Sequence, residues 1–313
     1  MPNYYKVMLG KGSQFAAQAL QGGFIGIDDA SGQDLSPLLA LPEPEFRQQV
    51  RPGLEATNPS SSKGTISQYA TTLWRIAQGI QGGDVILSPD GTAGQVRVGE
   101  VTGPYQYLAG EPLPHRRAVQ WHPQPIKRAD MSQALKNSSG GITTIIDLTE
   151  YGPEVVALAG LSTAGGVAMV ASIPDPSFGI EKELENFLVT NWAHTELGSH
   201  YDLYRDDSGD LIGQQFQTAT GPIDILAVKK DKSELLVIEL KRSKATDMVV
   251  GQIQRYMGYI KKEVAEPGQK VRGLIIALED DPKLQYALEV APEIGFYTYK
   301  VSFKLNHTGG HAL

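Results

Sequence analysis

Three segments between Gly221 and Tyr256 decide the fold of the C-terminal part: GPIDILAV at 221–228, LLVIELKR at 235–242 and GQIQRY at 251–256. The first two are apolar runs, and the short polar stretch between them suits a hairpin turn between two strands. Because side chains alternate faces along a strand, Glu239 and Lys241 must point the same way. The sequence therefore predicts that Asp224, Glu239 and Lys241 gather at one edge of a sheet.

Two carboxylates and one ammonium group at a strand edge suit metal-assisted hydrolysis of phosphodiesters. Carboxylate oxygens are ligands for Mg²⁺, and a cation can lie beside the attacked phosphate. The charges of Glu239 and Lys241 directly follow the apolar run 235–238, where charged side chains are uncommon without a specific role. A salt-bridged pair on a solvated strand is the alternative interpretation, and this apolar context disfavours it.

The order Asp, spacer, Glu-x-Lys resembles the PD-(D/E)XK nuclease superfamily. The segments IDILAV and VIELKR are most similar to its Mrr-like and NucS-like branches. Gln252 and Tyr256 resemble the Q-x-x-x-Y helix motif of the RecB-type subgroup. The resemblance covers roughly residues 180–277 and implies an α/β fold over residues 179–313, with a mixed central sheet flanked by helices.

The resemblance also implies the chemistry of a metal-dependent endodeoxyribonuclease. Asp224 and Glu239, with the main-chain carbonyl of Leu240, would hold Mg²⁺, for which Mn²⁺ would substitute. Lys241 would position the attacking water or stabilise the negative charge that develops on the phosphate. Gln252 would orient this lysine from the neighbouring helix.

Helical periodicity places two further elements around this edge. Residues 180–192 predict an amphipathic helix, and the E-x-x-L spacing of the related nucleases assigns its active-site glutamate to Glu181, with Glu185 one turn later as the alternative. Residues 246–263 predict a long helix on which Gln252 and Tyr256 are neighbours. Buried strands are predicted at 271–278 and 296–305, and 307–313 reads as a frayed tail.

Composition limits the possible functions. The chain has 313 residues, about two domains, with 41% hydrophobic and 20% charged residues. Because it has no cysteine, disulfides, zinc ribbons and thiol nucleophiles are excluded. No apolar leader or span is evident, so we expect a cytoplasmic protein. The net charge of −7 is unusual for a nucleic-acid-binding protein, so any basic surface must be local.

The N-terminal half has a β-rich pattern. A helix is predicted at 13–20, a strand at 24–27 and a helix at 66–80, whereas the Pro-, Asp- and Gln-rich stretch 28–59 predicts a long loop or lid. A hairpin is predicted at 84–102 around the turn PDG.

The pattern over residues 4–151 resembles the N-terminal part of Mrr-like modification-dependent restriction proteins. That part is similar to the PUA-like and EVE barrels, which bind modified or extruded bases. The resemblance implies a DNA-recognition domain at residues 1–152, and residues 153–178 read as a linker. The Ala- and Gly-rich segment 155–173 within that linker fits either a helix or a strand packed between domains.

A base pocket needs aromatic faces and a few polar groups. The candidates are Phe24, Asp28, Trp74, Tyr105, Tyr107 and Trp121, with Arg116 and Arg117 as candidate phosphate contacts. The alternative for the aromatic residues is ordinary packing in the core.

Together these features predict an enzyme that cuts double-stranded DNA to restrict foreign DNA. Base-modified DNA is the expected substrate, and a homodimer would allow both strands to be cut. A repair nuclease that senses mismatches or branches is one alternative. The other is a non-catalytic nucleic-acid-binding protein with a relic nuclease fold, which the complete Asp/Glu/Lys/Gln set disfavours.

Overall fold

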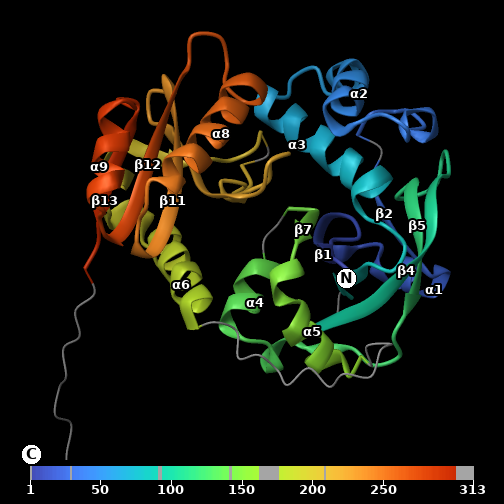
Figure 1. The fold of residues 1–313 in the computed structure, drawn as a ribbon. Helices are drawn as coiled ribbons and strands as arrows, with labels where there is room; N and C mark the ends of the chain where they lie inside the picture. The colour runs from blue at the N-terminus through green and yellow to red at the C-terminus, as the bar shows by residue number, and fades with distance from the viewer. Residues whose placement is uncertain are drawn as a thin grey trace, which may run out of the picture.

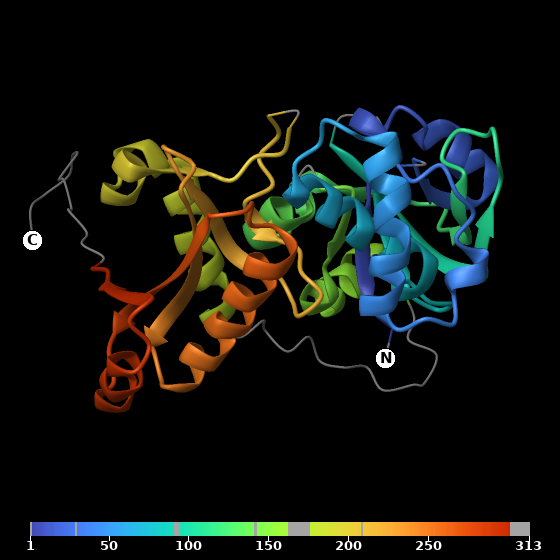
Figure 2. The same cartoon turned by 90° about the horizontal axis from the view of Figure 1, so that it is seen from above.

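The computed structural model describes residues 2–28, 30–90, 94–140, 143–161, 176–207 and 209–300. The described strands form two mixed sheets, one from each half of the sequence. Figures 1 and 2 show these sheets and their helices grouped side by side, with α3 and α8 approaching each other between the groups. The fold is therefore mixed α/β in both halves.

The first sheet has the strand order β2-β5-β4-β3-β1-β7, with β6 beside β4. Its strands are β1 (Tyr4–Val7), β2 (Phe24–Ile27), β3 (Val85–Pro89), β4 (Gln95–Tyr107), β5 (His115–Trp121), β6 (Ile126–Lys127) and β7 (Ile145–Asp147). The β3–β4 hairpin and the β2 strand form as predicted. Among the described strands, no pairing joins β2 to β7, so this sheet is open and the expected PUA-like barrel is not confirmed.

Helices cover both faces of the first sheet. They are α1 (Ala16–Gly22), α2 (Glu43–Thr57), α3 (Lys63–Trp74), α4 (Gln133–Ser139) and α5 (Gly152–Ala159), with short helical turns η1 (Lys11–Ser13), η2 (Ser36–Leu38), η3 (Arg75–Gly79), η4 (Arg128–Asp130) and η5 (Thr149–Tyr151). The side chains of α1 to α3 share one apolar core with the sheet. Residues of α4 and α5 pack in a second core on its other face.

Helix α2 overturns the prediction of a long loop over residues 28–59. Pro44 lies in its first turn, where the missing N–H of proline has no helical partner to lose. Phe46, Val50 and Leu54 recur at helical spacing and are fully buried. This apolar stripe stabilises the helix although Pro52 lies inside it.

The second sheet has the order β13-β12-β11-β10-β8, with β9 beside β10. Its strands are β8 (Tyr201–Leu203), β9 (Gln214–Phe216), β10 (Ile223–Lys229), β11 (Glu234–Lys244), β12 (Lys270–Glu279) and β13 (Ile294–Thr298). The predicted β10–β11 hairpin is confirmed, with Ile225 opposite Ile238. Strands β11, β12 and β13 run parallel to one another.

The second sheet is covered by α6 (Pro176–Thr190), η6 (Trp192–His194), α7 (Glu196–His200), α8 (Met248–Glu263) and α9 (Pro282–Glu289). Alternation along β11 separates its faces: Leu235 and Val237 pack in the same core as α8. Leu236 and Ile238 pack instead with residues of α6. Glu239 therefore lies on the α8 side of the sheet.

The connection between the halves is helical at both of its ends. Helix α5 lies at the start of the predicted linker 153–178, and helix α6 begins near its end. Most of the Ala- and Gly-rich segment 155–173 and the predicted tail 307–313 lie outside the described residues. Strand β13 begins two residues before the predicted strand 296–305, whose end also lies outside them.

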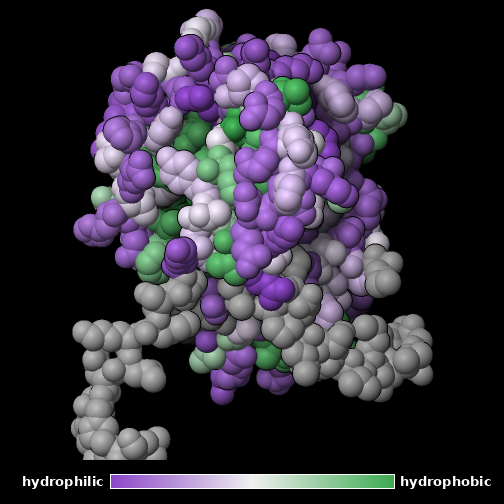
Figure 3. Space-filling view, turned by 60° about the vertical axis from the view of Figure 1, so that its left-hand side comes forward, coloured by the Kyte–Doolittle hydropathy of each residue, from purple (hydrophilic) through white to green (hydrophobic). Residues whose placement is uncertain are grey.

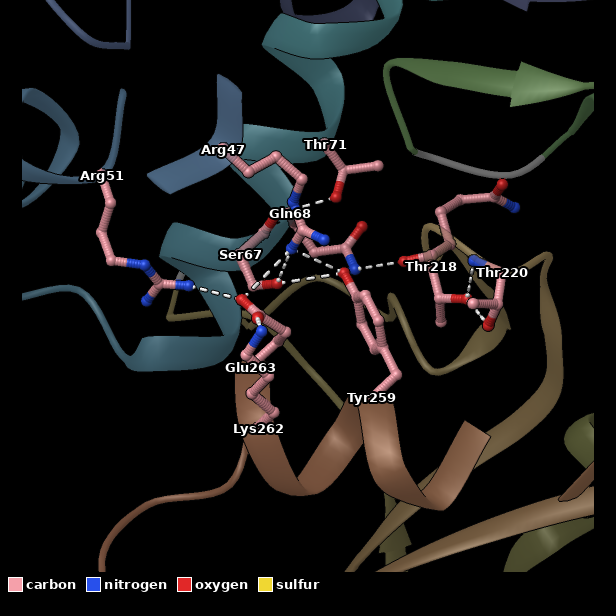
Figure 4. Close-up of polar contacts among 11 residues, drawn as sticks. Arg47, Arg51, Ser67, Gln68, Thr71, Thr218, Thr220, Tyr259, Lys262 and Glu263 are labelled. Atoms are coloured by element: carbon pink, nitrogen blue, oxygen red, sulfur yellow. Dashed lines mark hydrogen bonds and ion pairs between the residues drawn. The ribbon is translucent and has the colours of Figure 1, made fainter. Parts of the chain in front are cut away.

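A polar cluster joins the two halves where α2 and α3 meet α8 (Figure 4). Arg47 donates hydrogen bonds to Ser67 Oγ at 2.9 Å and to Tyr259 Oη at 2.8 Å. Arg51 pairs with Glu263 at 2.7 Å. Because Arg47, Ser67 and Tyr259 are buried, these bonds fix the position of α8 against the first half.

The outer face of the second half, turned forward in Figure 3, is mainly hydrophilic with scattered apolar side chains. Among the described residues, no helix has both the length and the apolar character needed to cross a membrane.

Candidate active site

The β10–β11 hairpin and α8 bring four of the predicted catalytic side chains to one end of the second sheet. Asp224 comes from β10, Glu239 and Lys241 from β11, and Gln252 from α8. The hairpin register places the end of β11 beside the start of β10, and the alternation of side chains turns Glu239 and Lys241 to one face. The predicted cluster is thus assembled by strand geometry.

Glu239 lies at the centre of the cluster and is only 2% exposed. Its Oε1 accepts hydrogen bonds from Lys241 Nζ at 2.6 Å and from Gln252 Nε2 at 2.7 Å. The resemblance implied that Gln252 orients Lys241. In the structure, the Gln252 amide contacts Glu239 instead. Gln252 also donates to Tyr256 Oη at 3.4 Å. The other carboxylate oxygen of Glu239, Oε2, is buried and has no hydrogen-bond partner among the residues that the structure describes.

Asp224 lies half-buried at the start of β10. Its Oδ2 accepts a hydrogen bond from the main-chain N–H of Leu240 at 2.8 Å. Burial raises the pKa of Asp224 well above its usual value, and the nearby negative charges of Glu239 and Glu185 raise it further. Burial also raises the pKa of Glu239. A pair of carboxylates with raised pKa values favours a bound cation, which would stabilise their charged forms.

Lys241 keeps its proton in this setting. Burial alone would lower its pKa, but the neighbouring carboxylates of Glu239 and Glu181 outweigh that effect and raise it. Glu181 Oε1 lies 3.5 Å from the ammonium nitrogen, and Glu181 Oε2 accepts from the N–H of Arg242 at 3.4 Å. Glu181 thus holds the lysine and the end of β11.

Glu185, the alternative glutamate on α6, is the one that lies toward Asp224. It is 2% exposed, pairs with Lys182 at 2.6 Å and accepts hydrogen bonds from Gln214 and Gln215. Gln215 also donates to Asp224 Oδ1 at 3.3 Å. The sequence patterns do not predict a role for Gln214 or Gln215. The feature that could have pointed to them is the amide-rich segment QQFQ, just before the Asp224 strand.

The residues present fit a divalent ion bound by few protein ligands. The described residues contain no group of three or more His, Asp or Glu side chains arranged to hold a metal. However, Glu239 Oε2 has no hydrogen-bond partner among the described residues, the charge of Glu239 acts on Asp224, and the Leu240 N–H already points to Asp224. Since the N–H and C=O of one strand residue point to the same side, the Leu240 carbonyl also points that way. Mg²⁺ commonly binds with one or two carboxylates and several waters.

Four of the candidate base-binding aromatic residues pack against other parts of the first half. Tyr105 is buried in the core, where its hydroxyl lies 2.7 Å from His115 Nδ1. Tyr107 packs against the same histidine ring. Phe24 is buried under the Arg116 guanidinium, and Trp121 packs at the margin of the same core. These four aromatic side chains therefore pack within the fold.

The two candidate phosphate-binding arginines are also used inside the first half. Arg117 is 5% exposed and donates to the carbonyls of Ile76 and Ala77 at 2.7 and 2.5 Å. Arg116 donates to the carbonyls of Leu113 and Pro112. The prediction of a phosphate contact is wrong for Arg117, because its guanidinium is enclosed by main-chain oxygens.

Two of the N-terminal candidates do line cavities, although different ones. Asp28 lines a cavity of about 710 Å³. Trp74 lines another of about 410 Å³, together with Glu43 and Arg75 and with Gln215 of the second half. Trp74 Nε1 and Glu43 Oε1 are buried and have no hydrogen-bond partner among the described residues. The second cavity is therefore lined by an aromatic side chain and by charged side chains of both signs.

Known proteins match the two halves separately. Residues 197–291 match the family described as the Endonuclease NucS C-terminal domain, a stretch that contains Asp224, Glu239, Lys241 and Gln252. Residues 5–149 match a domain of unknown function (DUF8426). The C-terminal part of the chain is thus similar to NucS.

Individual proteins named Endonuclease NucS also match part of this chain. Endonuclease NucS of Methanocaldococcus jannaschii is 36% identical over 66 residues, which are 21% of this chain and 24% of that protein. Endonuclease NucS of Pyrococcus horikoshii is 41% identical over 61 residues, 20% of this chain and 22% of that protein. The matches span about a quarter of these relatives. A solved structure described as an EndoMS–dsDNA2 complex aligns with a TM-score of 0.32 and 14% identity, over 70% of this chain and 66% of that one.

Proposed function

We propose that this chain is a Mg²⁺-dependent DNA endonuclease whose active site is the cluster around Glu239. The observation that carries the proposal is the state of this carboxylate. One oxygen accepts from Lys241 and Gln252, while the other is buried and has no hydrogen-bond partner among the described residues. An unpaired carboxylate oxygen in the interior is costly, and a divalent ion would stabilise it. The similarity of residues 197–291 to the NucS C-terminal domain supports the same activity.

The roles of the residues follow from their contacts. Asp224, Glu239 and the Leu240 carbonyl would hold Mg²⁺, with Mn²⁺ as a substitute. A bound divalent ion lowers the pKa of water and offsets charge on the phosphate oxygens. Lys241 holds its proton and presents a positive charge beside this position. Gln252 fixes Oε1 of Glu239 and so leaves Oε2 directed away from the lysine.

We propose that residues 1–152 select the DNA and that residues 179–313 cut it, because contacts to phosphates carry no information about sequence or damage. The cavity beside Trp74 is where we place selection. Its volume of about 410 Å³ and its lining by Trp74, Glu43 and Arg75 suit a base turned out of the duplex, which needs a ring to stack on and hydrogen-bonding partners for its edge.

An extruded base fits a nuclease that selects mismatches or other structural defects. Modification-dependent restriction rested on the resemblance to a PUA-like barrel, and the open first sheet removes that support. The test therefore compares three plasmids that are alike except for one feature: fully matched, carrying a mismatch, or carrying modified bases. Preference for the mismatched plasmid supports the repair role. Preference for the modified one would support restriction.

Catalysis itself is tested with one matched pair of variants. Glu239→Gln removes the central charge, whereas Glu234→Gln changes another buried glutamate on the same strand that bonds to Tyr201 instead. We expect Glu239→Gln to lose cleavage in Mg²⁺ and Glu234→Gln to retain it. Cleavage in EDTA, or cleavage by Lys241→Ala, would contradict the proposed mechanism. Binding without cleavage by the wild-type protein would instead support the non-catalytic alternative.

We further propose that the enzyme acts as a homodimer, because one active site cuts one strand and a double-strand break needs two. Sedimentation of the full chain on duplex DNA, together with nicked and linear product analysis, tests this. A monomer that makes only nicks would refute it.

A further inference from the structure

Gln215 joins two acidic groups of the active site, and neither the motifs nor the proposed mechanism gives it a role. Its Nε2 donates to Asp224 Oδ1 at 3.3 Å and also to Glu185 Oε2. The opposite oxygen of Asp224 is held by the N–H of Leu240. Asp224 is therefore fixed from both sides, by the main chain of β11 and by the side chain of Gln215.

The backbone of Gln215 adopts a conformation that is sterically unfavourable for a residue with a side chain. Its φ is +50°, in the left-handed region that residues other than glycine seldom adopt. Such conformations persist where the surroundings impose them. Here Gln217 Nε2 donates to the main-chain oxygen of Gln215 at 2.7 Å, and Gln217 is only 4% exposed.

Gln217 is in turn held by the first half of the chain. Arg75 Nη2 donates to Gln217 Oε1 at 2.7 Å, and Arg75 Nη1 donates to the carbonyl of Ile145 in β7 at 3.1 Å. Burial lowers the pKa of Arg75, and the charge of Asp147 partly offsets this. The guanidinium therefore bridges the first sheet and the loop that leads to Asp224.

We infer that Gln215 is a positioning residue for Asp224 and that Arg75 holds it in place through Gln217. The metal-binding edge of the second half is then complete only when the first half is docked against it. This inference rests on the proposed function, because it assigns Asp224 to the metal. Residues that orient metal ligands typically change metal affinity by about 10- to 100-fold when they are removed.

The test measures Mn²⁺ affinity of the full chain by calorimetry without DNA, together with the melting temperature of each variant. Gln215→Ala removes the bonds to both carboxylates. Gln217→Glu keeps an acceptor for Arg75 but removes the amide that bonds to the Gln215 oxygen. The matched control is Gln68→Ala, because Gln68 Nε2 donates to the main-chain oxygen of Gln217 at 2.9 Å and so supports the same loop without belonging to the chain of contacts.

We expect Gln215→Ala and Gln217→Glu to bind Mn²⁺ about 10-fold more weakly or worse, and Gln68→Ala to bind it as the wild type does. Because only positioning is lost, raising Mn²⁺ should restore most of the cleavage rate of both variants. If the wild type binds Mn²⁺ and cuts DNA, unchanged or tighter Mn²⁺ binding by Gln215→Ala and Gln217→Glu overturns this inference and leaves the proposed function intact. Equal loss in Gln68→Ala overturns it too, since loop stability would then explain the effect. A wild type that neither binds Mn²⁺ nor cuts DNA overturns both.

Discussion

Removing one oxygen atom from Tyr259 should weaken the contact between the two halves by a measurable amount. In Tyr259→Phe the ring remains, so its packing in the core of the second half and its contact with the Arg47 guanidinium, 5.1 Å from the ring centre, are retained. The lost hydroxyl accepts from Arg47 at 2.8 Å and bonds to Ser67 at 3.2 Å. The substitution therefore isolates the hydrogen bonds from the packing.

The expected magnitude follows from the charge and burial of these groups. A hydrogen bond that involves a charged group contributes about 1.5–3 kcal/mol. Arg47 keeps its bond to Ser67 at 2.9 Å and its ion pair with Glu263 at 3.5 Å, so the guanidinium is not left unpaired. We therefore expect Tyr259→Phe to lower the free energy of unfolding by about 1.5–3 kcal/mol.

Urea unfolding followed by tryptophan fluorescence measures this difference. Trp74 and Trp121 report on the first half and Trp192 on the second. Tyr286→Phe is the matched control, because that side chain is 78% exposed and its hydroxyl should contribute less than about 0.5 kcal/mol. A loss below about 0.5 kcal/mol in Tyr259→Phe would refute the importance of this cluster, since surface substitutions change stability by that much.

Three further substitutions test the electrostatics. Since burial raises the pKa of Asp224, its charged form destabilises the fold, so Asp224→Asn should unfold at a higher temperature than wild type in metal-free neutral buffer while losing cleavage. The difference in melting temperature between the two proteins should shrink as the pH falls through the raised pKa of Asp224. An Asp224→Asn protein that is less stable than the wild type at every pH would contradict this prediction. Burial lowers the pKa of Lys6 to about 7, so the unfolded state binds more protons above that pH. Wild-type stability should then rise by up to about 1.4 kcal/mol per pH unit relative to Lys6→Met, as pH-dependent urea titrations of both proteins would show. Arg117→Ala leaves the buried carbonyls of Ile76 and Ala77 without their donor and should lower the free energy of unfolding by about 1–3 kcal/mol for each carbonyl, without lowering DNA affinity at equal salt. Loss of DNA affinity in a folded Arg117→Ala protein would support the phosphate contact after all.

The second half could be predicted from sequence because its signals are local and periodic. The apolar runs of β10 and β11 and the apolar stripe of α8 follow the periods of a strand and a helix, and the strand alternation alone places Glu239 with Lys241. Helix α2 was missed because three prolines at 42, 44 and 52 indicate a loop, whereas two of them lie where an N–H is not needed.

The contacts that depend on distant segments could not be predicted. Gln215 lies on a strand of three residues with a left-handed φ, so it has no periodicity to detect. Because a guanidinium is rarely buried, the sequence favours an exposed phosphate contact for Arg117. Its partners are the carbonyls of Ile76 and Ala77, about 40 positions earlier in the chain. Sequence patterns show which groups are available, whereas tertiary structure decides what they bond to.

The polar character of the contact between the halves limits how such a protein can evolve. Arg47 and Ser67 meet Tyr259 and Glu263 through directional bonds in a buried setting. A recombination event that joined this nuclease half to a foreign recognition module would leave those groups without partners, and a buried unpaired charge is strongly destabilising. Shuffling of the nuclease half is therefore expected to carry α2 and α3 with it, or to require compensating changes on α8.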